Sequence, residues 1–333
     1  MLTDYIRLKG RYNKEKARLI LMNRIKKAVL KVFSYPYINL KKYYKSYRKF
    51  LNAINLYFKP IYNLMDHKII VDGREIQVRI FLTEKQKHNH NKVLIFFHGG
   101  GWVTGNIDSY TNICSNMSKQ TGYTVVSVDY RLAPEHPFPA GLEDCYHVAR
   151  AIFLNPDILE CKQSDITLIG DSAGANLAAA LSLMARDRGE FLPARQILIY
   201  PATYYDHSDN SPFDSIRENG TNYILTSKRI QDYWYLYISN EEDKYSPYAA
   251  PLLAGDLSDQ PKTLIITAEY DPLRDEGEAY GMRLKEYNND VKIHRMEGAL
   301  HGFISLPRSS GNVIKCYKII NAFLNEDSIE TRD

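Results

Sequence analysis

The sequence ITLIGDSAGANLAAA occupies residues 166–180 and decides the fold. Its apolar beginning, residues 166–169, is typical of a buried strand, and its alanine-rich end favours a helix. Glycines 170 and 174 flank Ser172. This is the strand, sharp turn and helix of a G-x-S-x-G motif, in which a side chain at either glycine would crowd its neighbours. The pattern predicts a nucleophilic Ser172 hydroxyl near a helix N-terminus, which favours the negative charge of a reacting carbonyl.

A second glycine-rich stretch, HGGGW, occupies residues 98–102 and follows the apolar run of residues 93–97. Glycine loses more backbone entropy on folding than any other residue, so three in a row are costly. Such a run is expected where main-chain N–H groups must approach a ligand closely. A loop of this type provides part of the oxyanion hole in lipases and esterases. We therefore expect the N–H groups of Gly100, Gly101 and Ala173 to form an oxyanion hole, and His98 to brace the loop.

An acid should follow the serine in the chain, and a base should follow the acid. Residues 262–268 are predicted to form a buried strand, and Asp271 lies just past its carboxyl end, where open α/β sheets place their active sites. Glu269 lies closer to the strand, and Asp275 is expected to cap the next helix. Asp271 is therefore the expected acid, and the other two carboxylates are the alternatives.

The base is expected to be His301, one of nine histidines. It lies in the loop after a strand predicted over residues 291–296 and is followed by Gly302. The other histidines lie in strands, helices or polar loops that do not combine this order with this position. Ser172, Asp271 and His301 are the expected triad.

These motifs resemble those of the hormone-sensitive-lipase-like group of α/β-hydrolases. The resemblance runs from about residue 92 to residue 305. It rests on HGGGW (98–102), DYRLAPE with HPFPA (129–140), GDSAG (170–174), SPYAAP (246–251), DPLRD (271–275) and HGF (301–303). It implies an α/β-hydrolase fold with a helical cap, with Ser172 as nucleophile, Asp271 as acid and His301 as base. Ala175 departs from the family, which usually has glycine there; the alanine should tighten local packing.

The rest of the chain predicts a mostly parallel, eight-stranded sheet with helices on both faces, since strands and helices alternate. The strands are expected to start near residues 67, 75, 92, 123, 165, 195, 262 and 290. The helices are expected near 108–120, 138–154, 173–187, 275–288 and 311–324. The first two strands are expected to form an antiparallel hairpin at the edge.

Two segments do not fit the sheet pattern, residues 1–65 and the insertion 203–245. The resemblance implies that both form the cap, over a catalytic domain of residues 66–202 and 246–333. Two or three aromatic residues of the insertion are expected to contact substrate. The candidates are Tyr204, Tyr205, Phe213, Tyr223, Tyr233, Trp234, Tyr235 and Tyr237.

The first 60 residues carry 16 Lys and Arg against Asp4 and Glu15, a net charge of +14; the whole chain is +4, so the remainder carries −10. The apolar residues of one predicted helical face are Leu21, Ile25, Ala28 and Val32, and basic residues surround them. Such a helix could make weak contact with a membrane surface, or it could be an ordinary cap helix. The cap helix is favoured because the family builds its cap from this end.

Several classes of function are not expected. The chain shows no metal or dinucleotide motif, so no metal or organic cofactor is expected, and no nucleic-acid module accompanies the basic N-terminus. There is no apolar stretch of membrane-spanning length and no signal-peptide pattern. Cys114, Cys145, Cys161 and Cys316 lack metal spacing and are expected to be reduced, so the expected location is the cytoplasm.

The sequence therefore predicts a serine carboxylic-ester hydrolase that acts on small, short-chain acyl esters through an acyl-enzyme. An amidase or a sugar-ester deacetylase would use the same triad, and a long-chain lipase would need membrane contact by the N-terminus. A ligand-binding protein on an inactive hydrolase scaffold is the alternative from another class. It is disfavoured because His301 is in place. The oligomeric state is left open.

Overall fold

The computed structural model describes residues 39–54, 64–71, 73–82 and 91–326. Within them, one sheet of eight strands has the order β1-β2-β4-β3-β5-β6-β7-β8. The strands are β1 Leu64–Val71, β2 Arg74–Phe81, β3 Val93–Phe97, β4 Thr124–Asp129, β5 Ile166–Asp171, β6 Arg195–Ile199, β7 Lys262–Tyr270 and β8 Val291–Leu300. The pairs from β4 through β8 are parallel, and β2 pairs antiparallel with β1 and β4. The predicted mostly parallel sheet with an edge hairpin is confirmed.

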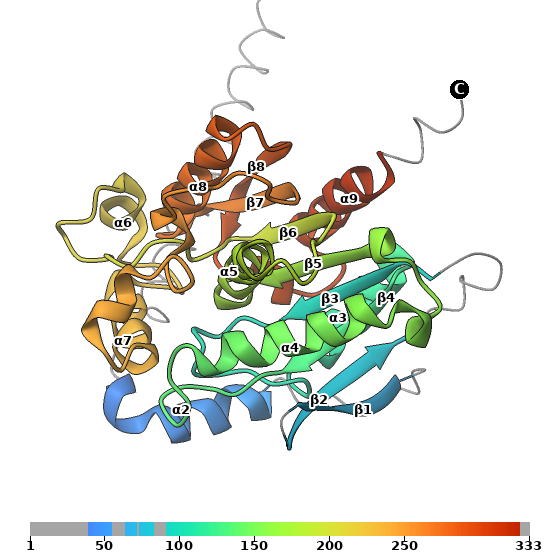
Figure 1. The fold of residues 1–333 in the computed structure, drawn as a ribbon. Helices are drawn as coiled ribbons and strands as arrows, with labels where there is room; N and C mark the ends of the chain where they lie inside the picture. The colour runs from blue at the N-terminus through green and yellow to red at the C-terminus, as the bar shows by residue number, and fades with distance from the viewer. Residues whose placement is uncertain (1–38, 55–63, 72, 83–90, 327–333) are drawn as a thin grey trace, which may run out of the picture.

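Helices cover both faces of this sheet. They are α3 Thr111–Thr121, α4 Ala140–Leu154, α5 Ala173–Arg188, α8 Arg274–Glu286 and α9 Gly311–Asn325. Alternate residues of β3 point to opposite faces: Leu94 and Phe96 share a core with α3 and α9, whereas Ile95 and Phe97 share one with α4, α5 and α8. Figure 1 shows α4 and α5 across one face of the sheet.

Three further helices are grouped at one end of the sheet (Figure 1). They are α2 Leu40–Ile54, α6 Asp214–Asn219 and α7 Ser227–Tyr237. Helix α2 packs on α7 and is anchored to loops after the strands, because Arg48 donates to the carbonyl of Val103 at 2.6 Å and pairs with Glu135 at 2.8 Å. Helix α6 packs on α8. Short 3₁₀ helices cover Pro156–Leu159, Gln163–Asp165, Glu241–Tyr245, Pro251–Leu253 and Phe303–Ser305.

Two expectations differ from the structure in detail. Strand β8 continues to Leu300, so that His301 directly follows a strand rather than a loop of several residues. Helix α8 begins at Arg274 with Leu273 at its N-cap, and so the prediction that Asp275 caps this helix is wrong. The carboxylate of Asp275 instead accepts a hydrogen bond from the main-chain N–H of Ser215.

The predicted basic helix around Leu21, Ile25 and Val32 lies outside the described residues. No helix in the described ranges combines the length and the apolar character that crossing a membrane requires.

Candidate active site

The three residues predicted to form a triad meet at the carboxyl edge of the parallel strands. Ser172 follows β5, Asp271 follows β7 and His301 follows β8, and the carboxyl ends of neighbouring parallel strands lie at the same edge. His301 Nε2 lies 2.9 Å from Ser172 Oγ, and His301 Nδ1 lies 2.7 Å from Asp271 Oδ2. The three side chains form one continuous hydrogen-bonded chain, in which Asp271 is fully buried and His301 is partly exposed.

The turn that carries Ser172 is strained. Ser172 has φ 55° and ψ −120°, a conformation that residues other than glycine rarely adopt. The strand and the helix on either side are in close contact, since a Cβ added at Gly170 would lie 2.3 Å from the carbonyl of Gly174, and one at Gly174 would lie 2.0 Å from the carbonyl oxygen of Phe97. Both glycines are therefore required for the turn.

The glycine loop faces the same cavity as Ser172. Gly100, Gly101 and Ala173 line that cavity together with Ser172 and His301. Ala173 is the first residue of α5, so its N–H has no acceptor within the helix. The three residues that the sequence predicts to supply oxyanion donors therefore line the same cavity as Ser172.

A buried carboxylate ties the glycine loop to the serine turn. Asp171 Oδ1 accepts a hydrogen bond from the N–H of Gly99 at 2.8 Å, and Oδ2 accepts from the hydroxyls of Tyr110 and Tyr200, each at 3.3 Å. Burial raises the pKa of Asp171 to about 6, although these hydrogen bonds oppose the shift. Its role here is to fix two loops relative to each other.

His98, which begins the glycine loop, is fully buried. Its Nδ1 lies 2.8 Å from the carbonyl oxygen of Gly99, and its ring stacks on Tyr130 with centroids 4.3 Å apart. Burial lowers the pKa of His98 to about 4, so its imidazole is neutral near pH 7. His98 supports the loop and does not contact Ser172.

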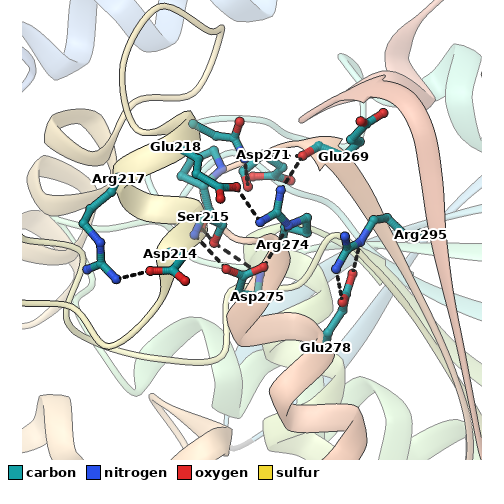
Figure 2. A network of polar contacts seen from close by, with 12 residues as sticks. Asp214, Ser215, Arg217, Glu218, Glu269, Asp271, Arg274, Asp275, Glu278 and Arg295 are labelled. Atoms are coloured by element: carbon teal, nitrogen blue, oxygen red, sulfur yellow. Dashed lines mark hydrogen bonds and ion pairs between the residues drawn. The ribbon is translucent and has the colours of Figure 1, made fainter.

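Helix α6 holds the loop that carries Asp271 (Figure 2). Ser215 Oγ donates to the carbonyl of Pro272 at 2.7 Å, and the Ser215 N–H donates to Asp275 Oδ2 at 2.7 Å. The amide of Asn219 donates to the carbonyl oxygens of Glu269 and Asp271, each at 3.3 Å. The backbone around Asp271 is therefore held by side chains that lie more than 50 residues earlier in the chain.

The carboxylates of the two alternative acids, Glu269 and Asp275, bind groups other than His301. Glu269 accepts from the N–H of Gly298 at 2.6 Å. Asp275 pairs with Arg274 at 2.8 Å, and the same guanidinium pairs with Glu218 of α6 at 2.8 Å (Figure 2). Within the described residues, Asp271 is the carboxylate that contacts His301.

The cavity above Ser172 has a volume of about 240 Å³ and is lined mainly by apolar side chains. Helix α2 contributes Tyr47 and Leu51, and α7 contributes Arg229, Ile230 and Tyr233. Of the eight aromatic residues predicted as candidates in the insertion, Tyr233 is the one that lines this cavity in the described part of the chain.

Some aromatic residues of the insertion pack elsewhere instead. Tyr237 stacks on Trp102 with centroids 4.3 Å apart, and Trp234 meets the edge of the same ring. Fewer of these residues line the cavity than the two or three that were expected to contact substrate. Tyr47, Leu51 and Arg229 were not predicted, and no motif or spacing in the sequence marks them.

The described residues hold no group of three or more His, Cys, Asp or Glu side chains arranged to bind a metal ion. All four cysteines are free and buried.

Comparisons with known proteins agree with this architecture. A family model described as "alpha/beta hydrolase fold" matches residues 94–305. The chain is similar to an arylesterase of Saccharolobus solfataricus, with 38% identity over 255 residues, which cover 76% of this chain and 81% of that protein. It is 30% identical to an ethyl acetate hydrolase of Pseudomonas putida over 237 residues, 71% of this chain and 73% of that protein. Among solved structures, a hyperthermophilic esterase from Pyrobaculum calidifontis matches with a TM-score of 0.81 and 34% identity, covering 92% of this chain and 98% of that one.

Proposed function

Because the chain belongs to the alpha/beta hydrolase family, in its hormone-sensitive-lipase-like group, we propose that Ser172, His301 and Asp271 form its catalytic triad. The chain is a carboxylic ester hydrolase, as its esterase relatives indicate. The observation that carries the assignment of residues is the unbroken contact from Ser172 Oγ through His301 to Asp271.

His301 Nε2 takes the proton of the Ser172 hydroxyl as Oγ attacks the ester carbonyl. Asp271 accepts from Nδ1–H, which holds the imidazole in the tautomer that leaves Nε2 free and stabilises the imidazolium. His301 then returns the proton to the leaving alkoxide, and an acyl group remains on Ser172. Water attacks this acyl-enzyme with His301 again as base, which releases the acid and restores the serine.

The N–H groups of Gly100, Gly101 and Ala173 stabilise the oxyanion that forms in each addition step. Removal of one such donor typically lowers kcat by about 10²- to 10³-fold. The contact of Asp171 with Gly99 supports this role, because it fixes the glycine loop to the turn that carries the nucleophile.

The preferred substrates are esters with short acyl chains. A cavity of about 240 Å³ is smaller than most ligand sites, and α2 and α7 contribute Tyr47, Leu51 and Tyr233 to its wall. We assign α2 and the insertion 203–245, which contains α7, to the cap; the sheet from β1 at Leu64 onward, without the insertion, belongs to the catalytic domain. The four free thiols support a reducing location such as the cytoplasm.

The test is hydrolysis of p-nitrophenyl esters from acetate to palmitate by the full chain. The proposal predicts a rate that peaks at about two to six acyl carbons and is lost in Ser172→Ala, whereas Ser164→Ala, an exposed serine remote from the cavity, keeps the rate. A peak at long chains that weakens with salt would favour a lipase that docks on membranes. The absence of a Ser172-dependent rate on every ester would favour an amidase or a non-catalytic ligand-binding protein.

A further inference from the structure

One cation lines the cavity in a setting that helix stability does not explain. Arg229 lies in the first turn of α7, the positive end of the helix dipole, where a positive charge is unfavourable. It is on the same helical face as Tyr233, one turn away, and the Tyr233 ring lies directly over Gly101 of the glycine loop. Arg229 therefore lines the same cavity as Gly100, Gly101 and Ala173, the residues of the predicted oxyanion hole.

The guanidinium is held in place but is not neutralised. Its Nη1 donates to the carbonyl of Ile224 at 2.9 Å, and its central carbon lies 5.9 Å from the centre of the Tyr47 ring. Within the described residues, Arg229 makes no ion pair, although its neighbour Lys228 pairs with Asp232 at 2.6 Å. Among the described residues, Asp171 is the one carboxylate that lines this cavity. Its oxygens accept hydrogen bonds from Gly99 and two tyrosines.

An arginine has five N–H donors in a planar arrangement that matches a carboxylate. One bond to Ile224 leaves most of these donors without a protein acceptor in the described part of the chain. The rest of the cavity wall is mainly apolar, so a neutral ester would make no use of this charge.

We propose that the substrates of this site are esters that carry a carboxylate remote from the ester bond, and that Arg229 binds this carboxylate. This inference rests on the proposed ester hydrolysis at Ser172. The carboxylate can belong to the acyl part, as in a monoester of a dicarboxylic acid, or to the alcohol part. In either position, the guanidinium would bind the carboxylate in the same way.

Two substrate pairs distinguish these sources. Monophenyl adipate and its neutral methyl ester place the charge on the acyl side, with phenol release as the readout. 4-Acetoxybenzoate and its methyl ester place the charge on the leaving group. The quantity compared is the ratio of kcat/KM for the anionic ester to that for its neutral partner, which removes any general effect of a substitution on the cavity.

Arg229→Gln keeps a donor for the Ile224 carbonyl and removes the charge. We expect it to lower the ratio about 10- to 100-fold for at least one pair, the range that a hydrogen bond between charged groups gives. The ratio for Arg229→Lys should lie between those of the wild type and Arg229→Gln, because lysine keeps the positive charge without the planar set of donors. Lys228→Gln makes the same change in net charge on the same helix outside the cavity, and should leave the ratio unchanged.

A ratio that falls for one pair assigns the carboxylate to that side of the ester. A ratio unchanged by Arg229→Gln in both pairs, or lowered equally by Lys228→Gln, would overturn the proposal while ester hydrolysis stands. If the wild-type protein hydrolyses none of the four esters, the proposed function and this inference both fail, whereas cleavage of the anionic esters alone supports both.

Discussion

The carboxylate of Asp171 accepts a hydrogen bond from the main-chain N–H of Gly99, with 2.8 Å between Oδ1 and the nitrogen. This contact joins the residue before the nucleophile to the loop that carries two of the predicted oxyanion donors. Because Asp171 is fully buried, its ionised form is costly in the folded protein, and its pKa rises to about 6 from an ordinary value of 3.8.

Asp171 should make stability depend on pH in a defined window. Between about pH 4 and pH 6 the folded chain binds more protons at this residue than the unfolded chain, so stability falls as pH rises, by up to about 3 kcal/mol. Asp171→Asn removes this dependence. Urea unfolding of both proteins at several pH values should show the variant gaining stability relative to wild type across the window; a difference that does not change with pH would contradict this.

Gly101→Ala should inactivate the enzyme without unfolding it. A Cβ at this position would lie 2.4 Å from the Tyr233 ring, and φ is +61°. Because a displacement of about 1 Å in an active site can cost 10²-fold, we expect kcat/KM to fall by at least about that factor. Gly122→Ala is the matched control, since its φ is +75° and nothing lies within 4 Å of the added atom. Equal activity of the two variants would refute the steric explanation.

Asp271→Asn should lower kcat by about 10³- to 10⁴-fold, because an amide in place of the carboxylate no longer stabilises the imidazolium. Glu269→Gln should have little effect, since that carboxylate accepts from Gly298 and does not contact His301. The measurement is steady-state ester hydrolysis. Near-normal activity of Asp271→Asn would move the role of acid to Glu269 or Asp275.

Ser215→Ala tests whether α6 positions the acid. The substitution removes the hydrogen bond to Pro272, and we expect kcat to fall about 5-fold, the equivalent of about 1 kcal/mol, with KM unchanged because Ser215 lies outside the cavity. Arg217→Gln, on the exposed side of the same helix, is the control. A change in KM alone, or equal effects of both variants, would show that α6 does not act through Asp271.

The residues around Ser172 were predictable because their signals are local. An apolar strand, two glycines around a serine and an alanine-rich helix are consecutive in the chain, and the parallel sheet brings the ends of β5, β7 and β8 to one edge. The order of Ser172, Asp271 and His301 was therefore enough to predict their juxtaposition.

The remaining parts of the site depend on contacts between segments with no local signature. Arg229 and Tyr47 meet only because α2 packs on α7. Outside the cavity, the buried pair of His207 and Glu276, 2.8 Å apart, likewise joins residues that had no distinguishing pattern in the sequence. Such contacts follow from how surfaces fit in three dimensions, which periodicity does not encode.

The most direct measurement is covalent labelling with a p-nitrophenyl dialkyl phosphate, followed by peptide mass mapping. The assignment of the nucleophile predicts one dialkylphosphoryl group per chain on Ser172, release of one equivalent of p-nitrophenolate, loss of ester hydrolysis in step with labelling, and no labelling of Ser172→Ala. Phosphorylation of a different residue, or full ester hydrolysis by the labelled protein, would contradict it.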